Sequence, residues 1–265
     1  MKIILHIVIV TLLTLLTQVG GIIWILTFGF FRFYKSDKSG WKKLSIFAII
    51  YIVSTFTMIP YLSNLSGRKP LPISNRGNLI PHNFITVLLN RHYVKPKLKA
   101  QLIGISNEVN NRNKSLKISY LDGNFPFIDG FPLLPHLSHN DGRKVDLSFF
   151  YTSGGISGNL KPSNTGYGKF EGPRNDEFNQ TKECKSKGSW HYDYTKFLTL
   201  GGRSDLKFDA KYTRELINLI AEERLTQKIL IEPHLKKRMH LTNGKIRFQG
   251  CHAVRHDDHI HYQIR

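Results

Sequence analysis

The chain has 265 residues, enough for one hydrophobic core and an additional segment, and its 38 Lys and Arg against 19 Asp and Glu give a formal net charge of +19. This surplus favours acidic partners such as wall polymers, anionic lipid or nucleic acid, and it equally fits a solvated basic surface. The sequence has no basic run interleaved with aromatic residues and no zinc-finger or helix-turn-helix signature. We therefore expect no nucleic-acid partner.

Two apolar runs open the chain, from Ile3 to Phe31 and from Leu44 to Leu62. Each is close to or above the roughly 20 residues that cross a bilayer, and the first far exceeds the roughly 7–15 apolar residues of a secretory signal. The segment between them is basic, and such short loops stay cytoplasmic; its charged residues are Arg32, Lys35, Asp37, Lys38, Lys42 and Lys43. These features predict a transmembrane hairpin in the cell (inner) membrane, with the rest of the chain facing the periplasm or exterior.

The stretch from Ser63 to His82 has the Gly, Pro, Ser and Asn content of a linker. We predict a transmembrane hairpin over 1–65, a linker over 66–80 and a second domain over 81–265. After residue 70 the chain has 30 basic and 18 acidic residues, a surplus of +12.

Cys184 and Cys251 lie too far apart for a CxxC-type zinc site, and an oxidising exterior would permit one disulfide between them. The sequence leaves their pairing open.

The second domain mixes strands and helices without a regular alternation. Residues 152–189 are rich in Gly, Ser, Asn and Lys, which is typical of a lid, a binding loop or a disordered segment. The pattern predicts an α+β fold with an antiparallel sheet. The expected helices are 83–93, 209–225 and 232–239, and the expected strands start near Leu116, Val145, Lys228, Lys245 and His259.

Histidine and aspartate gather on the polar faces of two of these strands. Asp146 lies on the face opposite Val145 and Leu147, and His259 and His261, two apart, project to one face of HIHYQI. Neutral imidazoles with one carboxylate are ligands that zinc accepts, and three protein ligands with an open fourth position suit hydrolysis by zinc-activated water. The sequence lacks HExxH, which excludes the helical zincin arrangement.

The spacing of these residues is similar to that of a known family. His139 with Asp146 seven positions later, paired with a C-terminal His259-Ile260-His261, resembles the LAS group of zinc peptidases, which cleave peptidoglycan peptides. The longer strings HLSHNDGRKVD and HDDHIH, together with KILIEPHLKKRM, resemble the penicillin-insensitive murein endopeptidases within that group. The resemblance covers roughly Leu116 to Arg265.

The resemblance implies a Zn²⁺ site and a set of catalytic histidines. The implied metal ligands are His139, Asp146 and His261. His259 would act as general base or stabilise the tetrahedral intermediate, and His136 and His256 match further histidines lining such sites, as catalytic or orienting residues. Related enzymes often have a glutamate three residues before the last zinc histidine, where this chain has the shorter Asp258. We therefore expect His259 to be the base.

These expectations describe a membrane-anchored zinc metallopeptidase that hydrolyses D-amino-acid peptide bonds in peptidoglycan cross-links. Its partners would be peptidoglycan peptides and, through the hairpin, the membrane. The chain departs from the family, whose members are exported soluble proteins with several disulfides. An alternative is therefore a catalytically inactive, zinc-dependent cell-wall binding module. A third hypothesis is a basic, membrane-tethered binder of nucleic acid or lipid, which would leave the histidines unexplained.

Overall fold

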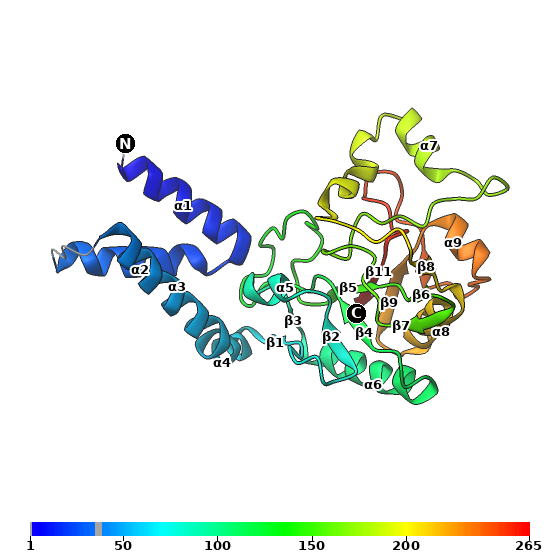
Figure 1. Cartoon of the computed structure of the whole chain (residues 1–265), viewed down its shortest axis with the longest axis horizontal. Coiled ribbons are helices and arrows are strands. Elements are labelled where there is room, and N and C mark those ends of the chain that lie inside the picture. Colours follow the sequence, from blue (N-terminus) through cyan, green and yellow to red (C-terminus); the bar gives the residue numbers. More distant parts are fainter. Residues whose placement is uncertain (1, 35–38) are drawn as a thin grey trace. The chain divides into compact units, whose positions relative to one another are not determined.

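The structure is a computed structural model that describes residues 2–34 and 39–265 (Figure 1). The predicted cytoplasmic residues Lys35, Asp37 and Lys38 lie outside the described part. The chain divides into two compact units built from interleaved segments. The first unit comprises Met1–Leu71, Ile85–Pro96 and Gly123–Gly142, and the second comprises Pro72–Phe84, Lys97–Asp122 and Arg143–Arg265. The boundaries predicted near residues 65 and 81 remain predictions.

The first unit contains the N-terminal helices and one short two-stranded pairing. Strand β1 (Lys69–Pro70) pairs antiparallel with β3 (Tyr93–Val94). The predicted helix from Asn83 to Tyr93 is only one short helix, α5 (Phe84–Leu88), most of which belongs to this unit. The helices that precede β1 are α1 (Lys2–Thr17), α2 (Gly20–Phe33), α3 (Gly40–Phe56), α4 (Met58–Ser63) and the 3-10 helix η1 (Asn64–Ser66).

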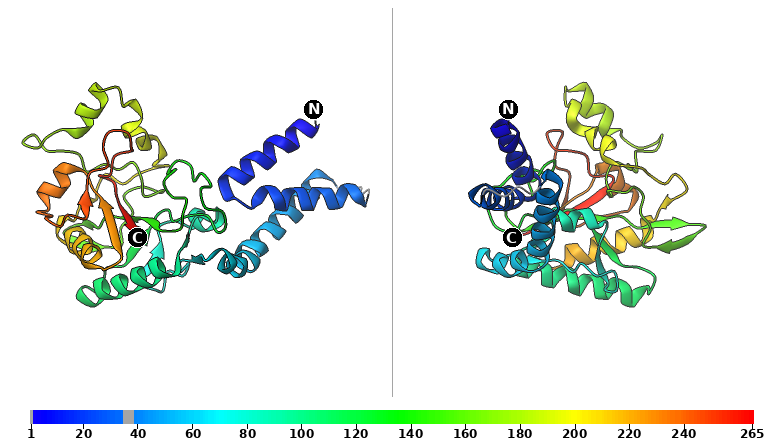
Figure 2. Two further views of the ribbon diagram at one scale, coloured as in Figure 1. Left: turned by 180° about the vertical axis from the view of Figure 1, so that it is seen from behind. Right: turned by 60° about the vertical axis from the view of Figure 1, so that its left-hand side comes forward.

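The first apolar run is broken into two helices at Gln18, which has a φ of 66°. The backbone N–H of Gly20 donates to Thr17 Oγ1 at 2.8 Å, which satisfies one orphan donor at the start of α2. A Cβ at Gly21 would lie 1.9 Å from Thr14 Oγ1, so only glycine allows α2 to approach α1 this closely. The turn between the two dark-blue helices can be followed in Figure 2.

This break corrects the predicted hairpin of two spans. Among the described residues, no single helix is both long and apolar enough to cross a membrane. The bent pair Gly40–Phe56 and Met58–Ser66, with an angle of 42° between its two parts, meets the length and composition requirement only when both parts are taken together. The run from Ile3 to Phe31 is therefore two shorter helices, and a continuous span there is wrong.

The core of the second unit is a mixed sheet, which among the described residues has six strands in the order β10-β9-β11-β5-β4-β2. Two neighbouring pairs, β10 with β9 and β2 with β4, are parallel, whereas the central pairs are antiparallel. The strands are β2 (Leu79–Pro81), β4 (Ile118–Tyr120), β5 (Lys144–Ser148), β9 (Thr226–Leu230), β10 (Ile246–Arg247) and β11 (His259–Ile264).

The α+β class is thus confirmed, and the fully antiparallel sheet is wrong. Parallel neighbours need a crossover connection, usually a helix. Helix α6 (Pro96–Arg112), which the sequence analysis missed, lies between β2 and β4 along the chain. Helix α9 (Pro233–Arg238) lies between β9 and β10, within the predicted range 232–239, and begins at Pro233.

Tyr262 shows which way the side chains of β11 point. Its hydroxyl donates to Gln101 Oε1 of α6 at 3.0 Å. Helix α8 (Ala210–Glu222) packs beside α6 and is capped by Asp209, whose Oδ1 accepts from the Tyr212 N–H at 3.1 Å. Because side chains alternate along a strand, the residues on either side of Tyr262 face away from these helices.

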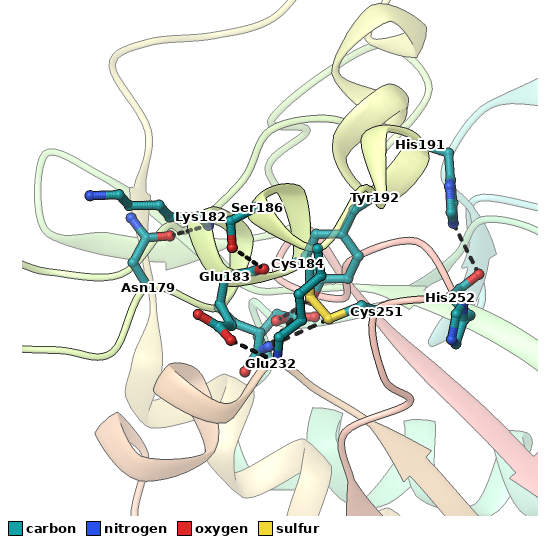
Figure 3. Close-up of a disulfide and its surroundings, with 12 residues drawn as sticks. Asn179, Lys182, Glu183, Cys184, Ser186, His191, Tyr192, Glu232, Cys251 and His252 are labelled. Atoms are coloured by element: carbon teal, nitrogen blue, oxygen red, sulfur yellow. Dashed lines mark hydrogen bonds and ion pairs between the residues drawn. A yellow bond between two sulfur atoms is a disulfide. The ribbon is translucent and has the colours of Figure 1, made fainter.

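The segment predicted as a long loop, 152–189, contains short elements. A three-stranded sheet in the order β7-β6-β8 begins it, with β6 (Tyr151–Ser153), β7 (Ile156–Gly158) and the more distant β8 (Lys207–Phe208). Helix α7 (Gln180–Ser186) ends it, followed by the 3-10 segment η2 (Trp190–Leu198). Cys184 of α7 forms a disulfide with Cys251, which settles the pairing that the sequence left open (Figure 3).

Reduction of this disulfide should destabilise the protein. The bond joins residues separated by 67 positions, and the chain-entropy relation gives about 4 kcal/mol for a loop of that size. We expect the melting temperature of the full chain in detergent to fall on addition of dithiothreitol. The Cys184→Ser/Cys251→Ser variant should melt at the lower temperature with or without reductant. Equal melting of the oxidised wild type and this variant would contradict a stabilising role.

Candidate metal centre

Asp146 and His261 lie directly opposite each other on adjacent antiparallel strands, β5 and β11. His261 Nδ1 is 2.9 Å from Asp146 Oδ1, and both side chains are buried. Directly opposite residues project to the same face of a sheet. The strand register therefore brings together a carboxylate and an imidazole that are 115 positions apart in the sequence.

His259 joins this pair from the same face of β11. Its Nε2 lies 3.7 Å from Asp146 Oδ2. Its Nδ1 is 2.5 Å from Asp258 Oδ1, so the Nδ1–H donates to this carboxylate and the Nε2 side of the ring faces Asp146. Asp258 also accepts from the Gly168 N–H at 2.6 Å through Oδ2. Asp258 thus holds His259 in one orientation.

His139 is held by a bond that selects its ligand atom. Its Nδ1 is 2.8 Å from the Gly123 carbonyl oxygen, which can only accept, so Nδ1 carries the proton. Nε2 is then the ring nitrogen that could bind a metal ion. An orienting bond of this kind to a backbone carbonyl is common for metal-binding histidines.

A buried group of three residues can hold a metal ion: His136, His139 and Asp146 each offer one ligand atom, and these atoms lie within 4.8 Å of one another. This group shares His139 and Asp146 with the predicted ligand set and contains His136 where the resemblance implied His261. His261 lies next to Asp146 and remains a further donor. The assignment of ligand and catalytic roles to these residues stays a prediction.

Tyr167 belongs to the site, and sequence reasoning missed it. Its hydroxyl donates to Asp146 Oδ2 at 2.9 Å and lies 3.3 Å from Asp122 Oδ2, and its ring packs edge-on against His259 with centroids 5.0 Å apart. Gly168 has a φ of +79°, and a Cβ there would lie 2.4 Å from the Thr195 carbonyl oxygen. The Gly-Tyr-Gly triplet at 166–168 was the available signal, because glycine is needed where backbone approaches this closely.

His256 lies beside the two histidines of β11, with its ring centroid 5.0 Å from that of His259 and 5.7 Å from that of His261. Its position is fixed through the main chain. The His256 N–H donates to Glu232 Oε1 at 3.0 Å, and the Glu232 N–H donates to the His256 carbonyl at 3.2 Å. Tyr192 donates to Glu232 Oε2 at 2.7 Å (Figure 3). Glu232 thus supports the segment that leads into β11.

Glu232 lies in a buried region that also contains the carboxylate of Asp257. Burial raises the pKa of Glu232 to about 7, and the negative charge of the nearby Asp257 adds to this shift. Asp257 is itself paired with Arg255, whose Nε lies 2.6 Å from its Oδ1. Arg255 also stacks over the ring of Phe170 at 3.9 Å. The paired charges hold the residues just before the β11 histidines in one conformation.

The pKa of Glu232 predicts a pH dependence of stability. Because it is raised above the ordinary value of 4.5, the folded state binds more protons than the unfolded state between about pH 5 and 7. The free energy of unfolding should therefore fall as pH rises through this window, by up to about 3 kcal/mol from this group. The measurement is urea unfolding of wild type and Glu232→Gln from pH 5 to 8. A difference between the two proteins that does not change with pH would contradict the prediction.

Comparisons with protein-family models and with curated proteins find no match to this sequence. The geometry of the site is therefore the ground for a functional assignment. The structure provides a buried group, His136, His139 and Asp146, that can hold a metal ion. Further imidazoles, His259 and His261, lie within 4 Å of Asp146.

Proposed function

We propose that this protein is a zinc metallopeptidase, anchored at the membrane, that hydrolyses D-amino-acid peptide bonds in peptidoglycan cross-links. The observation that carries the proposal is the convergence of buried imidazoles on Asp146: His261 lies opposite it in the sheet, and His136 and His139 offer ligand atoms within 4.8 Å. The resemblance of the surrounding strings to murein endopeptidases supplies the substrate class.

The donor set fits zinc. Zinc accepts imidazole nitrogen and carboxylate oxygen at about 2.0–2.2 Å, which places neighbouring ligand atoms of a tetrahedral site about 3.3 Å apart. In the group His136, His139 and Asp146 the ligand atoms lie within 4.8 Å of one another, so metal binding would draw them closer together. In the proposed set, His261 Nδ1 lies 2.9 Å from Asp146 Oδ1. We propose His139, Asp146 and His261 as the ligands, with His136 as an orienting or catalytic residue beside them. Zinc bound there would polarise the peptide carbonyl and supply a nucleophilic water at neutral pH.

His259 is the residue best placed to move a proton. Its Nδ1–H donates to Asp258, and its Nε2 faces Asp146 at 3.7 Å. A carboxylate behind an imidazole fixes its tautomer and stabilises the imidazolium formed when it takes a proton. We assign His259 as general base and Asp258 as the residue that orients it. His256, next to His259, would contact the substrate or the developing charge.

Two further observations fit a location at the outer side of a membrane. The Cys184–Cys251 disulfide is typical of an oxidising compartment. The N-terminal helices expose many large apolar side chains, which marks a membrane or protein contact; examples are Ile3, Ile4, Leu26, Phe33 and Trp41. The surplus of positive charge after residue 70 favours the carboxylate-bearing polymers of the wall.

The proposal predicts one zinc ion per chain, held through His139 and Asp146. Full-length protein purified in detergent should contain close to one equivalent by elemental analysis. His139→Ala and Asp146→Ala should each lose most of it, because each removes a ligand. His82→Ala is the matched control, since His82 is also a buried histidine but bonds to the Ser163 carbonyl at 2.9 Å, apart from this group. Equal zinc in His139→Ala and His82→Ala would contradict the assignment.

The proposal also predicts zinc-dependent cleavage of cross-linked muropeptides. His259→Ala should retain zinc and lose activity by about 10²-fold or more, the range expected for a general base. No serine is acylated in this chemistry, so penicillin should not inhibit the reaction. Cross-linked muropeptides that stay intact with the zinc-loaded wild type, under conditions where a known endopeptidase cleaves them, would contradict the proposal. Zinc-dependent wall binding without cleavage would instead favour the inactive binding module.

A further inference from the structure

We propose that Arg68, at the end of the N-terminal helical segment, is a positioning residue that sets the conformation of the loop carrying His136 and His139. The loop is Gly123–Gly142, and this inference rests on the proposed metal site. The N-terminal segment would then help to form the proposed metal site, in addition to any role as a membrane anchor. Every contact in the argument lies within the first unit.

Secondary structure does not fix the conformation of the loop Gly123–Gly142. Across Gly123–Gly142 it has no helix or strand, and its one ladder contact is the isolated bridge between Asn124 and Tyr93. Loops of this length without regular structure depend on contacts to other segments for a single conformation. His136 and His139 lie near its far end, remote from the bridge in sequence. Contacts from other parts of the first unit, such as the Lys95 N–H to the Gly142 carbonyl at 2.7 Å, add to the His139–Gly123 bond in fixing the part of the loop that bears the histidines.

Arg68 supplies that contact from within the protein interior. Its side chain has no exposed surface, whereas that of its ion-pair partner Asp129 is 64% exposed. The guanidinium donates to the Phe125 carbonyl and, at 3.3 Å, to the Asn140 carbonyl. These two carbonyls belong to the entering and leaving arms of the loop. The planar guanidinium reaches the two carbonyls with two different nitrogens held in a fixed fork, whereas an ammonium carries all its donors on one compact nitrogen.

The contact with the leaving arm acts next to the metal-binding histidine. Asn140 follows His139 directly, and its carbonyl also accepts from the Gly130 N–H at 2.8 Å. At the end of the arm, Gly142 has a φ of +77°, and a Cβ there would lie 3.2 Å from Arg68 Nε. A side chain at Gly142 would therefore crowd the guanidinium, and the positive φ favours glycine at this position. Displacement of Arg68 would remove its hydrogen bond to the Asn140 carbonyl, next to His139 in the backbone.

A second contact ties the entering arm to the helices. The Phe127 N–H donates to Gln18 Oε1 at 2.8 Å, at the break between α1 and α2. The Phe127 side chain packs against an apolar cluster that contains the helix residues Val19, Ile23, Trp24, Phe47 and Ile59 together with Tyr93 of β3. The unusual backbone of Gln18 therefore has a role beyond bending the helix: it directs a side-chain acceptor to the loop. The N-terminal segment contacts the loop at two independent points.

The test is the zinc dissociation constant of the full chain in detergent, measured by competition with a chromophoric chelator. Arg68→Ala should bind zinc at least tenfold more weakly, the range found when residues that orient metal ligands are removed. Arg68→Lys should lose most of this affinity as well, because it keeps the charge but has a single nitrogen in place of the two that bind the two carbonyls. Asp129→Asn should stay within twofold of wild type, because the exposed carboxylate contributes little.

Leu216→Ala, in a helix of the second unit with a fully buried side chain, is the matched control for loss of stability alone. It should lower the melting temperature and leave the zinc affinity of the folded protein unchanged. An Arg68→Ala protein that is folded and binds zinc within twofold of wild type would overturn the inference. An equal loss in Asp129→Asn would overturn it too, because the ion pair and not the carbonyl contacts would then matter.

Two further measurements test the inference if Arg68→Ala does not fold or if the wild type binds no zinc. Should Arg68→Ala not fold, Gln18→Ala tests the second contact, and an affinity within twofold of wild type would count against the inference. Should the wild type bind no zinc, the proposed function fails, and hydrogen exchange of the loop amides still tests Arg68. Protection of the amides of 123–142 should then fall in Arg68→Lys relative to Asp129→Asn, and equal protection would overturn the role.

Discussion

The site depends on the register in which β11 pairs with β5. Asp146 meets His261 only because these two residues are directly opposed, and a slip of one position would turn the β11 histidines to the face covered by helices. The register is held from that other face, where the Tyr262 hydroxyl reaches Gln101 of α6. Core packing and the position of the site are therefore set by the same alternation of side chains along one strand.

Buried charge is the second constraint. Asp146 and Asp258 lie among imidazoles in a region with almost no exposed surface, and Tyr167 donates to Asp146. Isolated carboxylates in such a place would be costly, so each has a donor. A divalent cation would further compensate this charge, and it would compete with the His261 proton for the Asp146 oxygen. Binding of such a cation would thereby be linked to pH and to the stability of the sheet.

Local patterns in the sequence predicted much of the second unit. The sequence predicted a helix over 209–225, where α8 forms, and the strict alternation in HIHYQI predicted β11 and its histidine face. Long-range features were not predictable in the same way. Helix α6 has a mostly polar sequence, and Tyr167 lies in a glycine-rich stretch without a period, so both depend on tertiary contacts. The break at Gln18 falls inside a continuous apolar run, where composition alone favours one helix.

The central claim is that residues from distant parts of the chain share one metal ion. Anomalous diffraction at the zinc edge, from crystals of the zinc-loaded full chain, tests it most directly. The account predicts a single peak within about 2.3 Å of an Asp146 carboxylate oxygen, His139 Nε2 and a His261 ring nitrogen. A peak bound elsewhere, or none at the Asp146 carboxylate, would contradict it.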